Sequence, residues 1–255
     1  MKIGIITAMP EEFRAVAKSL GTAAATQFGI FRAGRFNSAG HEILLVESGM
    51  GFGNAAKAAE ALVRDGRPDL LISTGFCGGI APELHAGDVV VAEHVIIADG
   101  SDIEEAPVLL SPIGRTFVAS QAAEGRRVFG GAFVSTSAIT SKVRLSGMLP
   151  GRYRNPVVEM ESGAIAGVAA ENGIPLLAIR AVSDSADEEL GFTLDEFSGP
   201  DMSRIRLHKV LLTVLRKPRI IPQLLRLSRS SRKAGENLTA SLSRLFSTLQ
   251  DASCR

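Results

Sequence analysis

The residues best suited to chemistry are three carboxylates and one arginine. Glu12, Glu161 and Asp184 each follow a short apolar run that predicts a strand, and Arg180 lies within the last of these runs. Open α/β sheets bind ligands at the carboxyl ends of their strands, so these side chains are expected to converge on one small polar substrate. Any one carboxylate alone is better explained as a helix cap or a solvated charge. Together they indicate a site in which two carboxylates can divide the roles of general base and general acid.

The elements that must position these groups alternate between strands and helices, which predicts an α/β fold with a mainly parallel sheet. Residues 99–107 are acidic and are expected to form a loop, and residues 136–155 a loop with a short helix. The predicted strands are 2–7, 29–34, 41–47, 70–73, 88–98, 128–135, 157–158 and 176–182, and the predicted helices are 10–19, 54–65, 112–123, 162–172 and 201–216.

Composition excludes several classes of protein. Of the 255 residues, 45% are hydrophobic and 22% are charged, as is typical of a globular protein with one sizeable core. No apolar run reaches the roughly 18 residues that a membrane span needs. The two cysteines are too far apart in sequence to suggest a disulfide framework or a metal site. A cytoplasmic location is therefore expected.

The C-terminal part of the chain differs from the rest in charge. Residues 201–255 hold 12 Lys and Arg against 3 Asp and Glu, a net charge of +9, so the preceding residues carry −8. Leucines recur at helical spacing in residues 218–255, with Arg and Lys between them, which predicts one or two basic amphipathic helices. We expect this extension, following a domain of residues 1–217, to bind an anionic membrane surface, to pack on the acidic body or to form a dimer contact.

Two glycine-rich turns and the histidines could serve other functions, namely nucleotide binding, a thiol nucleophile, a metal site and a hydrolase triad. Their spacing gives these functions weaker support. The turn 49–53 lacks the spacing G-x-G-x-x-G and the Lys-Ser/Thr of a P-loop, although its backbone N–H groups could still meet a ligand. Cys77, in the turn 74–79, is better explained as a small buried packing residue than as a nucleophile. The four histidines show no ligand spacing, and no G-x-S-x-G elbow is present, so a metal site and a hydrolase triad are disfavoured.

Five motifs together resemble the purine nucleoside phosphorylase/nucleosidase superfamily over about residues 1–215. The nearest branch is that of the 5′-methylthioadenosine/S-adenosylhomocysteine nucleosidases. Each glycine turn alone is unspecific, whereas the pairing of Glu-Met-Glu with Arg-Ala-Val-Ser-Asp is specific. The motifs are Gly4-Ile-Ile-Thr-Ala-Met-Pro-Glu-Glu12, Ser48-Gly-Met-Gly51, Thr74-Gly-Phe-Cys-Gly-Gly79, Val158-Glu-Met-Glu161 and Arg180-Ala-Val-Ser-Asp-Ser-Ala-Asp187.

The resemblance implies a phosphorylase/hydrolase-like three-layer α/β fold with a mixed, partly barrel-like central sheet, assembled as a homodimer. It also implies cleavage of the N-glycosidic bond of a small purine nucleoside without a metal or organic cofactor and without nucleic acid as a partner. Asp184 would be the general acid that protonates the purine at N7. Glu12 would be the base that activates the attacking water.

The resemblance also implies which residues bind the substrate. Met160 and Glu161 would hold the ribose, Arg180 would lie near the nucleophile, and Met50 would line the sugar and base pocket. The other binding residues implied are Phe76, Gly78, Ile139, Glu159 and Ser183.

Three hypotheses about function follow. The first is hydrolysis of a 5′-modified adenosine with release of adenine, which Glu12 favours because a carboxylate would repel a bound phosphate. The second is phosphorolysis, with Arg180 and the glycine-turn N–H groups holding phosphate. Its substrate could be a lipid-linked adenosine at the inner membrane face, because the basic tail is similar to that of hopanoid-associated nucleoside phosphorylases or nucleosidases. The third is a nucleoside-binding protein without catalysis, which the retention of all three carboxylates disfavours.

Overall fold

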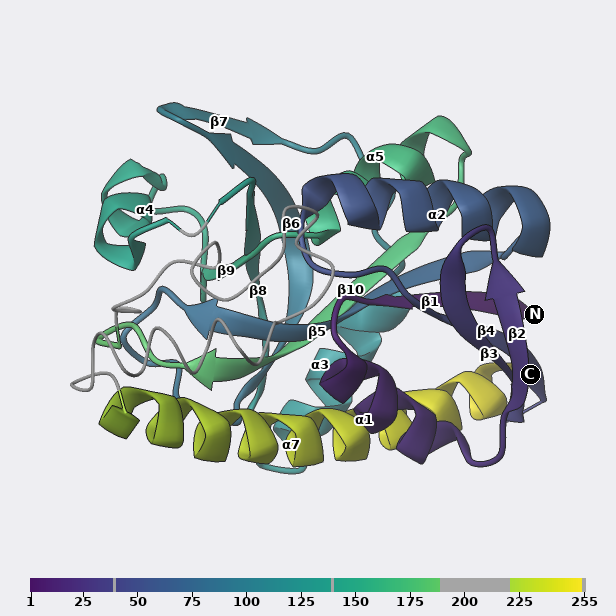
Figure 1. Cartoon of the computed structure of the whole chain (residues 1–255). Coiled ribbons are helices and arrows are strands. Elements are labelled where there is room, and N and C mark those ends of the chain that lie inside the picture. Colours follow the sequence, from purple (N-terminus) through teal and green to yellow (C-terminus); the bar gives the residue numbers. More distant parts are fainter. Residues whose placement is uncertain (39, 139, 189–220, 254–255) are drawn as a thin grey trace.

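The computed structural model describes residues 1–38, 40–138, 140–188 and 221–253. Strands form a central sheet with helices on both sides (Figure 1). The predicted helix 201–216 lies outside the described residues. The elements are β1 (Lys2–Thr7), α1 (Pro10–Leu20), β2 (Ala24–Phe28), β3 (Phe31–Ser38), β4 (His41–Glu47), α2 (Phe52–Gly66), β5 (Leu70–Gly79), β6 (Val89–Asp99), β7 (Asp102–Glu105), α3 (Ile113–Ala123), β8 (Val128–Thr136), α4 (Lys142–Met148), β9 (Val157–Glu159), α5 (Ser162–Glu171), β10 (Leu176–Asp184) and α7 (Ile221–Ser253).

Five of the strands close into a barrel. β5 pairs with β10 in parallel, β10 with β6 antiparallel, β6 with β8 and β8 with β9 in parallel, and β9 with β5 antiparallel. From β5 the sheet continues through β1, β4, β3 and β2 as an open wing. The mixed, partly barrel-like sheet predicted by the family resemblance is therefore confirmed. The closure matters for the site because it brings the ends of β5, β9 and β10 together.

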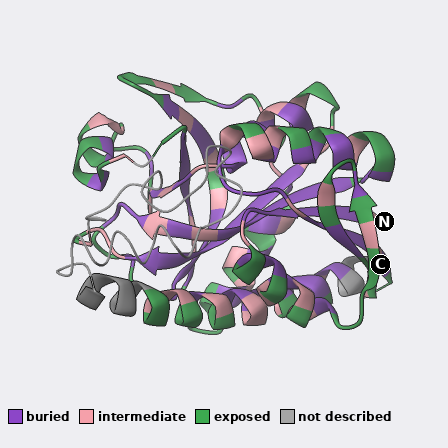
Figure 2. Ribbon diagram, in the orientation of Figure 1, coloured by how far each residue is buried: buried purple, intermediate pink, exposed green. Residues whose placement is uncertain are grey.

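Alternating apolar residues on the central strands produce the three layers. Ile3 and Ile5 of β1 face a core cluster that includes side chains of α1, α3 and α7. Ile6 of β1 and Leu71 of β5 face the opposite cluster, which α2 and α5 cover. Successive strand residues point to opposite faces of a sheet, so strands that are apolar at nearly every position must be covered on both sides. Figure 2 shows the buried residues concentrated on the strands and on the inner sides of the helices.

The C-terminal residues form one long helix, α7, that packs on the body. Leu238, Leu242, Leu245 and Leu249 are all at most 2% exposed and join the core cluster that contains α1. The Thr239 hydroxyl also donates a hydrogen bond to a main-chain carbonyl of α1, at 3.0 Å. Of the alternatives for the tail, packing on the body is the one observed in the described part of α7. No helix within the described residues is long and apolar enough to cross a membrane.

Two edge strands depart from the sequence expectations. The expected loop over residues 99–107 is wrong, because β7 runs antiparallel to β6 with Ile103 opposite Ala98. β2, which the sequence did not predict, pairs in the same way with β3. Most side chains of both strands are at least partly exposed. Their composition therefore resembles that of a loop, and only the backbone pairing with a longer neighbour makes them strands.

We predict that Leu242→Ala lowers the free energy of unfolding by 2–5 kcal/mol, on the order expected when a fully buried leucine is truncated. Urea unfolding followed by circular dichroism measures the change. Ser243→Ala is the matched control, because the neighbouring serine is exposed and bonds only within its own helix. Its effect should stay within about 0.5 kcal/mol. Equal stability of the two variants would contradict the packing of α7 on the body.

Candidate active site

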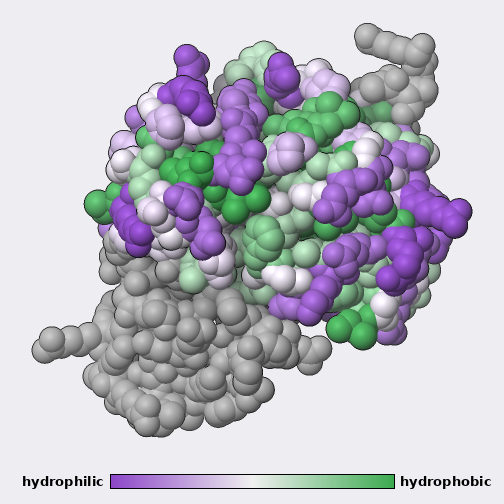
Figure 3. Space-filling view, turned by 90° about the horizontal axis from the view of Figure 1, so that it is seen from above, coloured by the Kyte–Doolittle hydropathy of each residue, from purple (hydrophilic) through white to green (hydrophobic). Residues whose placement is uncertain are grey.

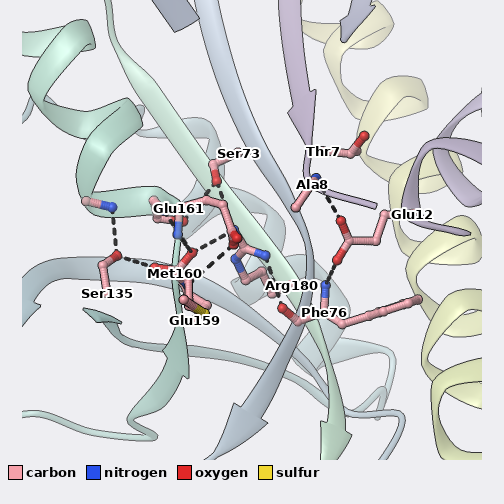
Figure 4. A network of polar contacts seen from close by, with 12 residues as sticks. Thr7, Ala8, Glu12, Ser73, Phe76, Ser135, Glu159, Met160, Glu161 and Arg180 are labelled. Carbon is pink, nitrogen blue, oxygen red and sulfur yellow. Dashed lines mark hydrogen bonds and ion pairs between the residues drawn. The ribbon is translucent and has the colours of Figure 1, made fainter. Parts of the chain in front are cut away.

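A buried arginine organises the site. Arg180 of β10 is 1% exposed, and its Nη2 atom forms ion pairs with Glu159 at 2.6 Å and with Glu161 at 3.1 Å. Nη1 donates to the carbonyl oxygen of Phe76 at 3.0 Å, and Nη2 also lies 3.4 Å from the Ser73 hydroxyl. Figure 4 shows these groups converging from β5, β9 and β10. One guanidinium thus links β5 and β10 to the end of β9 and the start of α5.

The two glutamates beside Arg180 are fixed by the junction between β9 and α5. Glu159 accepts the N–H groups of Glu161 at 3.0 Å and Ser162 at 2.8 Å, and it also accepts a hydrogen bond from the Ser135 hydroxyl. It therefore satisfies free N–H donors at the start of α5, where a negative charge is favoured. Glu161 accepts the N–H of Gly51 at 2.9 Å. The glycine turn after β4 is thereby tied to the carboxylate.

Glu12 is positioned by the first turn of α1. One carboxylate oxygen accepts the N–H groups of Ala8 at 2.8 Å and Met9 at 2.9 Å, and the other accepts the N–H of Phe76 at 2.8 Å. The side chain therefore folds back on its own turn and also links α1 to β5. Position 75 must be glycine for this contact, because a Cβ atom there would collide with the Glu12 carboxylate.

Burial changes the acidity of the carboxylates at this end. It raises the pKa of Glu12 to about 7, with Arg180 opposing the shift and the charge of Glu161 adding to it. Burial likewise raises the pKa of Glu161, against the opposing charge of Arg180. A carboxylate with a pKa near 7 can exchange a proton at neutral pH, which is what a general base needs.

Asp184 stands at the opposite end of the site, where β10 finishes. A register shift between Val182 and Asp184 in the pairing with β5 turns this segment. The Ser183 hydroxyl donates to Asp184 Oδ1 at 2.5 Å, and Lys142 Nζ forms an ion pair with Oδ2. Gly78 leaves room for this pair, since a Cβ atom there would lie 2.9 Å from Lys142 Cε and 3.0 Å from Asp184 Oδ2.

These groups surround one cavity of about 220 Å³. Arg180 is buried behind it and reaches it through Glu161, and Ile139 lies outside the described residues. Nine of the eleven predicted site residues line the cavity: Glu12, Met50, Phe76, Gly78, Glu159, Met160, Glu161, Ser183 and Asp184.

The cavity also contains residues that the sequence did not single out for binding. Lys142, Thr136 and Thr140 line it. The Thr136 hydroxyl is buried and has no hydrogen-bond partner among the described residues. Cys77 also lines the wall, and burial raises the pKa of its thiol. This agrees with a packing residue, since the nucleophilic form of cysteine is the thiolate.

Comparison with known proteins places the chain in a family. A family model described as the phosphorylase superfamily matches residues 2–216. This chain belongs to that superfamily. Among its curated relatives is a 5′-methylthioadenosine/S-adenosylhomocysteine nucleosidase of Shewanella piezotolerans, 31% identical over 84% of this chain and 97% of the relative. The nucleosidase of the same description from Shewanella halifaxensis is 33% identical over 77% and 92%.

A solved structure extends this likeness to the fold. The methylthioadenosine/adenosylhomocysteine nucleosidase of Neisseria meningitidis, in complex with methylthio-immucillin-A, matches with a TM-score of 0.73 and 24% identity. The match covers 97% of this chain and 99% of that one. The predicted superfamily and its nucleosidase branch are therefore confirmed. The division into residues 1–217 and an extension 218–255 stays a prediction.

We predict that Arg180→Met lowers the free energy of unfolding by about 3–5 kcal/mol at pH 7.5, because it leaves Glu159 and Glu161 buried without a compensating charge. The loss should shrink toward pH 5.5, since burial raises the pKa of Glu161 and its protonated form no longer needs that charge. Urea unfolding at both pH values measures it. Arg14→Met removes an exposed ion pair with Glu11 and should cost no more than about 1 kcal/mol. Similar effects of the two substitutions would contradict the central role of Arg180.

Proposed function

We propose that this protein is a purine nucleosidase, which uses water to cleave the N-glycosidic bond of a 5′-modified adenosine and releases adenine. The observation that carries the proposal is that Glu12, Glu161 and Asp184, which come from different elements, line the same cavity. The relatives named above are described as nucleosidases for 5′-methylthioadenosine and S-adenosylhomocysteine, which supports substrates of that class.

The reaction places opposite charges on its two products, and the cavity provides for both. As the C1′–N9 bond breaks, its electron pair leaves with the purine and positive charge develops on the ribose. Asp184 lies at the end where a proton would reach the base. Glu12 lies at the other end, where it takes a proton from the attacking water. General acid–base assistance of this kind contributes about 10²–10⁴-fold to the rate.

The ribose is held between these ends by Met160 and Glu161. The Glu161 carboxylate can accept hydrogen bonds from ribose hydroxyls while it keeps its bonds to Gly51 and Arg180. Its negative charge also stabilises the positive charge that develops on the sugar ring in the transition state. Binding and catalysis therefore share one buried carboxylate.

Water is favoured over phosphate as the nucleophile because Arg180 is already occupied. Phosphorolysis would use this guanidinium to hold phosphate, yet it is paired with Glu159 and Glu161. Glu12, which lies on the same side, would repel an anion in its ionised form. The buried carboxylates leave no net positive charge to attract phosphate at this end of the cavity.

A homodimer is part of the proposal, on the strength of the family resemblance. On α2, Phe52 and Val63 stay partly exposed. Seen from above, the molecule shows apolar groups gathered in patches among hydrophilic ones (Figure 3). Such patches suit contacts between subunits. Sedimentation velocity showing only monomer at micromolar concentration would contradict the dimer.

Contact of α7 with an anionic membrane surface is also proposed, through charge alone. Arg229, Arg232 and Lys233 are exposed, whereas the apolar stripe of the helix is buried in the body. Each basic residue near an anionic surface adds about 1 kcal/mol, so binding should be weak and salt-sensitive. Flotation with phosphatidylserine vesicles at low and high salt tests it, and absence of binding at low salt would contradict it.

We predict that purified protein releases adenine from 5′-methylthioadenosine at the same rate with and without 10 mM phosphate, a concentration of about the size used to drive phosphorolysis. Chromatography of the released base and sugar measures the reaction. Free 5-methylthioribose, without a sugar phosphate, is the expected second product because water is the nucleophile. Strict dependence on phosphate would overturn hydrolysis, and no base release from any purine nucleoside would favour a binding protein.

We predict that kcat/KM falls about tenfold per pH unit below about pH 7, because Glu12 acts as a base only when ionised and its pKa is about 7. Glu12→Gln should lower kcat/KM at pH 7.5 by about 10²–10⁴-fold, the usual range for a lost general base. The decline of kcat/KM below pH 7, the acidic limb of the profile, should also disappear. Glu11→Gln, an exposed neighbour on α1, is the matched control. An unchanged limb in Glu12→Gln would assign the base to another residue.

A further inference from the structure

Lys142 is a buried lysine at the first residue of α4. It is 6% exposed, and its ammonium group forms an ion pair with Asp184 Oδ2. It also donates to three main-chain carbonyl oxygens, those of Asp184 at 3.3 Å, Ser185 at 2.6 Å and Glu188 at 3.0 Å. A buried charge needs such partners because its desolvation is costly. The fold therefore holds a cation at this position although its desolvation is unfavourable.

The ammonium group is also part of the cavity wall. Lys142 and Asp184 line the cavity together beside Gly78 of β5, whereas Glu12 lies beside Phe76 of the same strand. Both oxygens of Asp184 are engaged: Oδ1 accepts a hydrogen bond from the Ser183 hydroxyl, and Oδ2 forms an ion pair with Lys142 Nζ. A lysine ammonium carries three protons and is a donor only. In this arrangement the proton nearest to Asp184 Oδ2 is carried by Lys142 Nζ.

We propose that the Lys142–Asp184 pair, and not Asp184 alone, protonates the leaving base. The proposal rests on the nucleosidase function proposed above. As the C1′–N9 bond breaks and its electron pair moves to the purine, one proton passes from Lys142 Nζ through Asp184 Oδ2 to the base. Glu12 takes one proton from the attacking water, and afterwards Lys142 regains a proton from solvent while Glu12 releases one. Lys142 acts through Asp184 and is thus a positioning residue that also supplies its proton.

A purely structural role of Lys142 makes a different prediction. The bonds to the carbonyls of Asp184, Ser185 and Glu188 would alone fix the chain that follows β10. Loss of these bonds would lower the rate of cleavage of every substrate to a similar extent. Loss of a proton supply would instead affect only those substrates whose base needs a proton to leave. The nature of the leaving group therefore separates the two roles.

We predict that Lys142→Met lowers kcat for 5′-methylthioadenosine by about 100-fold, the lower part of the range for general acid help, with KM changed by less than about threefold. The same variant should lose less than about threefold on the 7-methylated derivative, whose base already carries a positive charge and leaves without a proton. Base release is followed by chromatography. Asp184→Asn should show the same dependence on the leaving group, and Lys57→Met, an exposed lysine of α2, should change neither rate.

Two further variants keep the test decisive. Lys142→Arg retains the charge but cannot give up a proton, and Lys142→Gln keeps donors for the carbonyls, so neither should recover more than about threefold of the lost rate. Recovery of the rate by Lys142→Arg would overturn the proton supply in favour of a purely electrostatic role.

Equal losses on both substrates, or no loss on either, would overturn the proposal in favour of a purely structural role. If the wild type does not cleave the methylated substrate, the test uses 5′-methylthioadenosine alone. A rise in the KM of Lys142→Met for that substrate with little change in kcat would then overturn the proposal. Absence of adenine release by wild type would instead refute the nucleosidase function itself.

Discussion

The structure depends above all on one buried guanidinium that balances several carboxylates. Arg180 touches Glu159 and Glu161 directly, and its charge also acts on Glu12. Three largely buried carboxylates therefore share the charge of one arginine. The raised pKa values of Glu12 and Glu161 are the consequence, because burial opposes ionisation more strongly than a single shared cation supports it.

This shared charge is useful only because the carboxylates are held in place. Backbone N–H groups from the turn before α1, from β5, from α5 and from the glycine turn after β4 donate to them. Fixed donors keep each carboxylate at its position without the reorganisation that water would need. The barrel supplies this arrangement, since β5 pairs directly with both β9 and β10 and brings their residues together. The strand pairing that forms the barrel therefore also positions the site residues.

The sequence predicts those residues whose position follows from a strand. Glu12, Glu161 and Asp184 could be found because each comes directly after an apolar run, and the motifs around them supplied the rest. Lys142 could not be found, because it reaches Asp184 from a polar segment without periodicity, and only the folded chain brings α4 beside β10. The same limit applies to α7. Its leucines predict an amphipathic helix, but the spacing of a stripe does not say whether protein or lipid covers it.

The two ends of the cavity are built on different principles. At the Glu12 end every donor is a main-chain N–H, so the carboxylate has a single geometry. At the Asp184 end the partners are the side chains of Ser183 and Lys142, and the ammonium group is itself held by three main-chain carbonyls. A base that activates water needs a fixed direction of attack, which main-chain N–H donors provide. An acid needs a partner that can exchange a proton, which an ammonium group can do and a peptide N–H cannot. The arrangement of donors therefore agrees with the assignment of base and acid independently of the family resemblance.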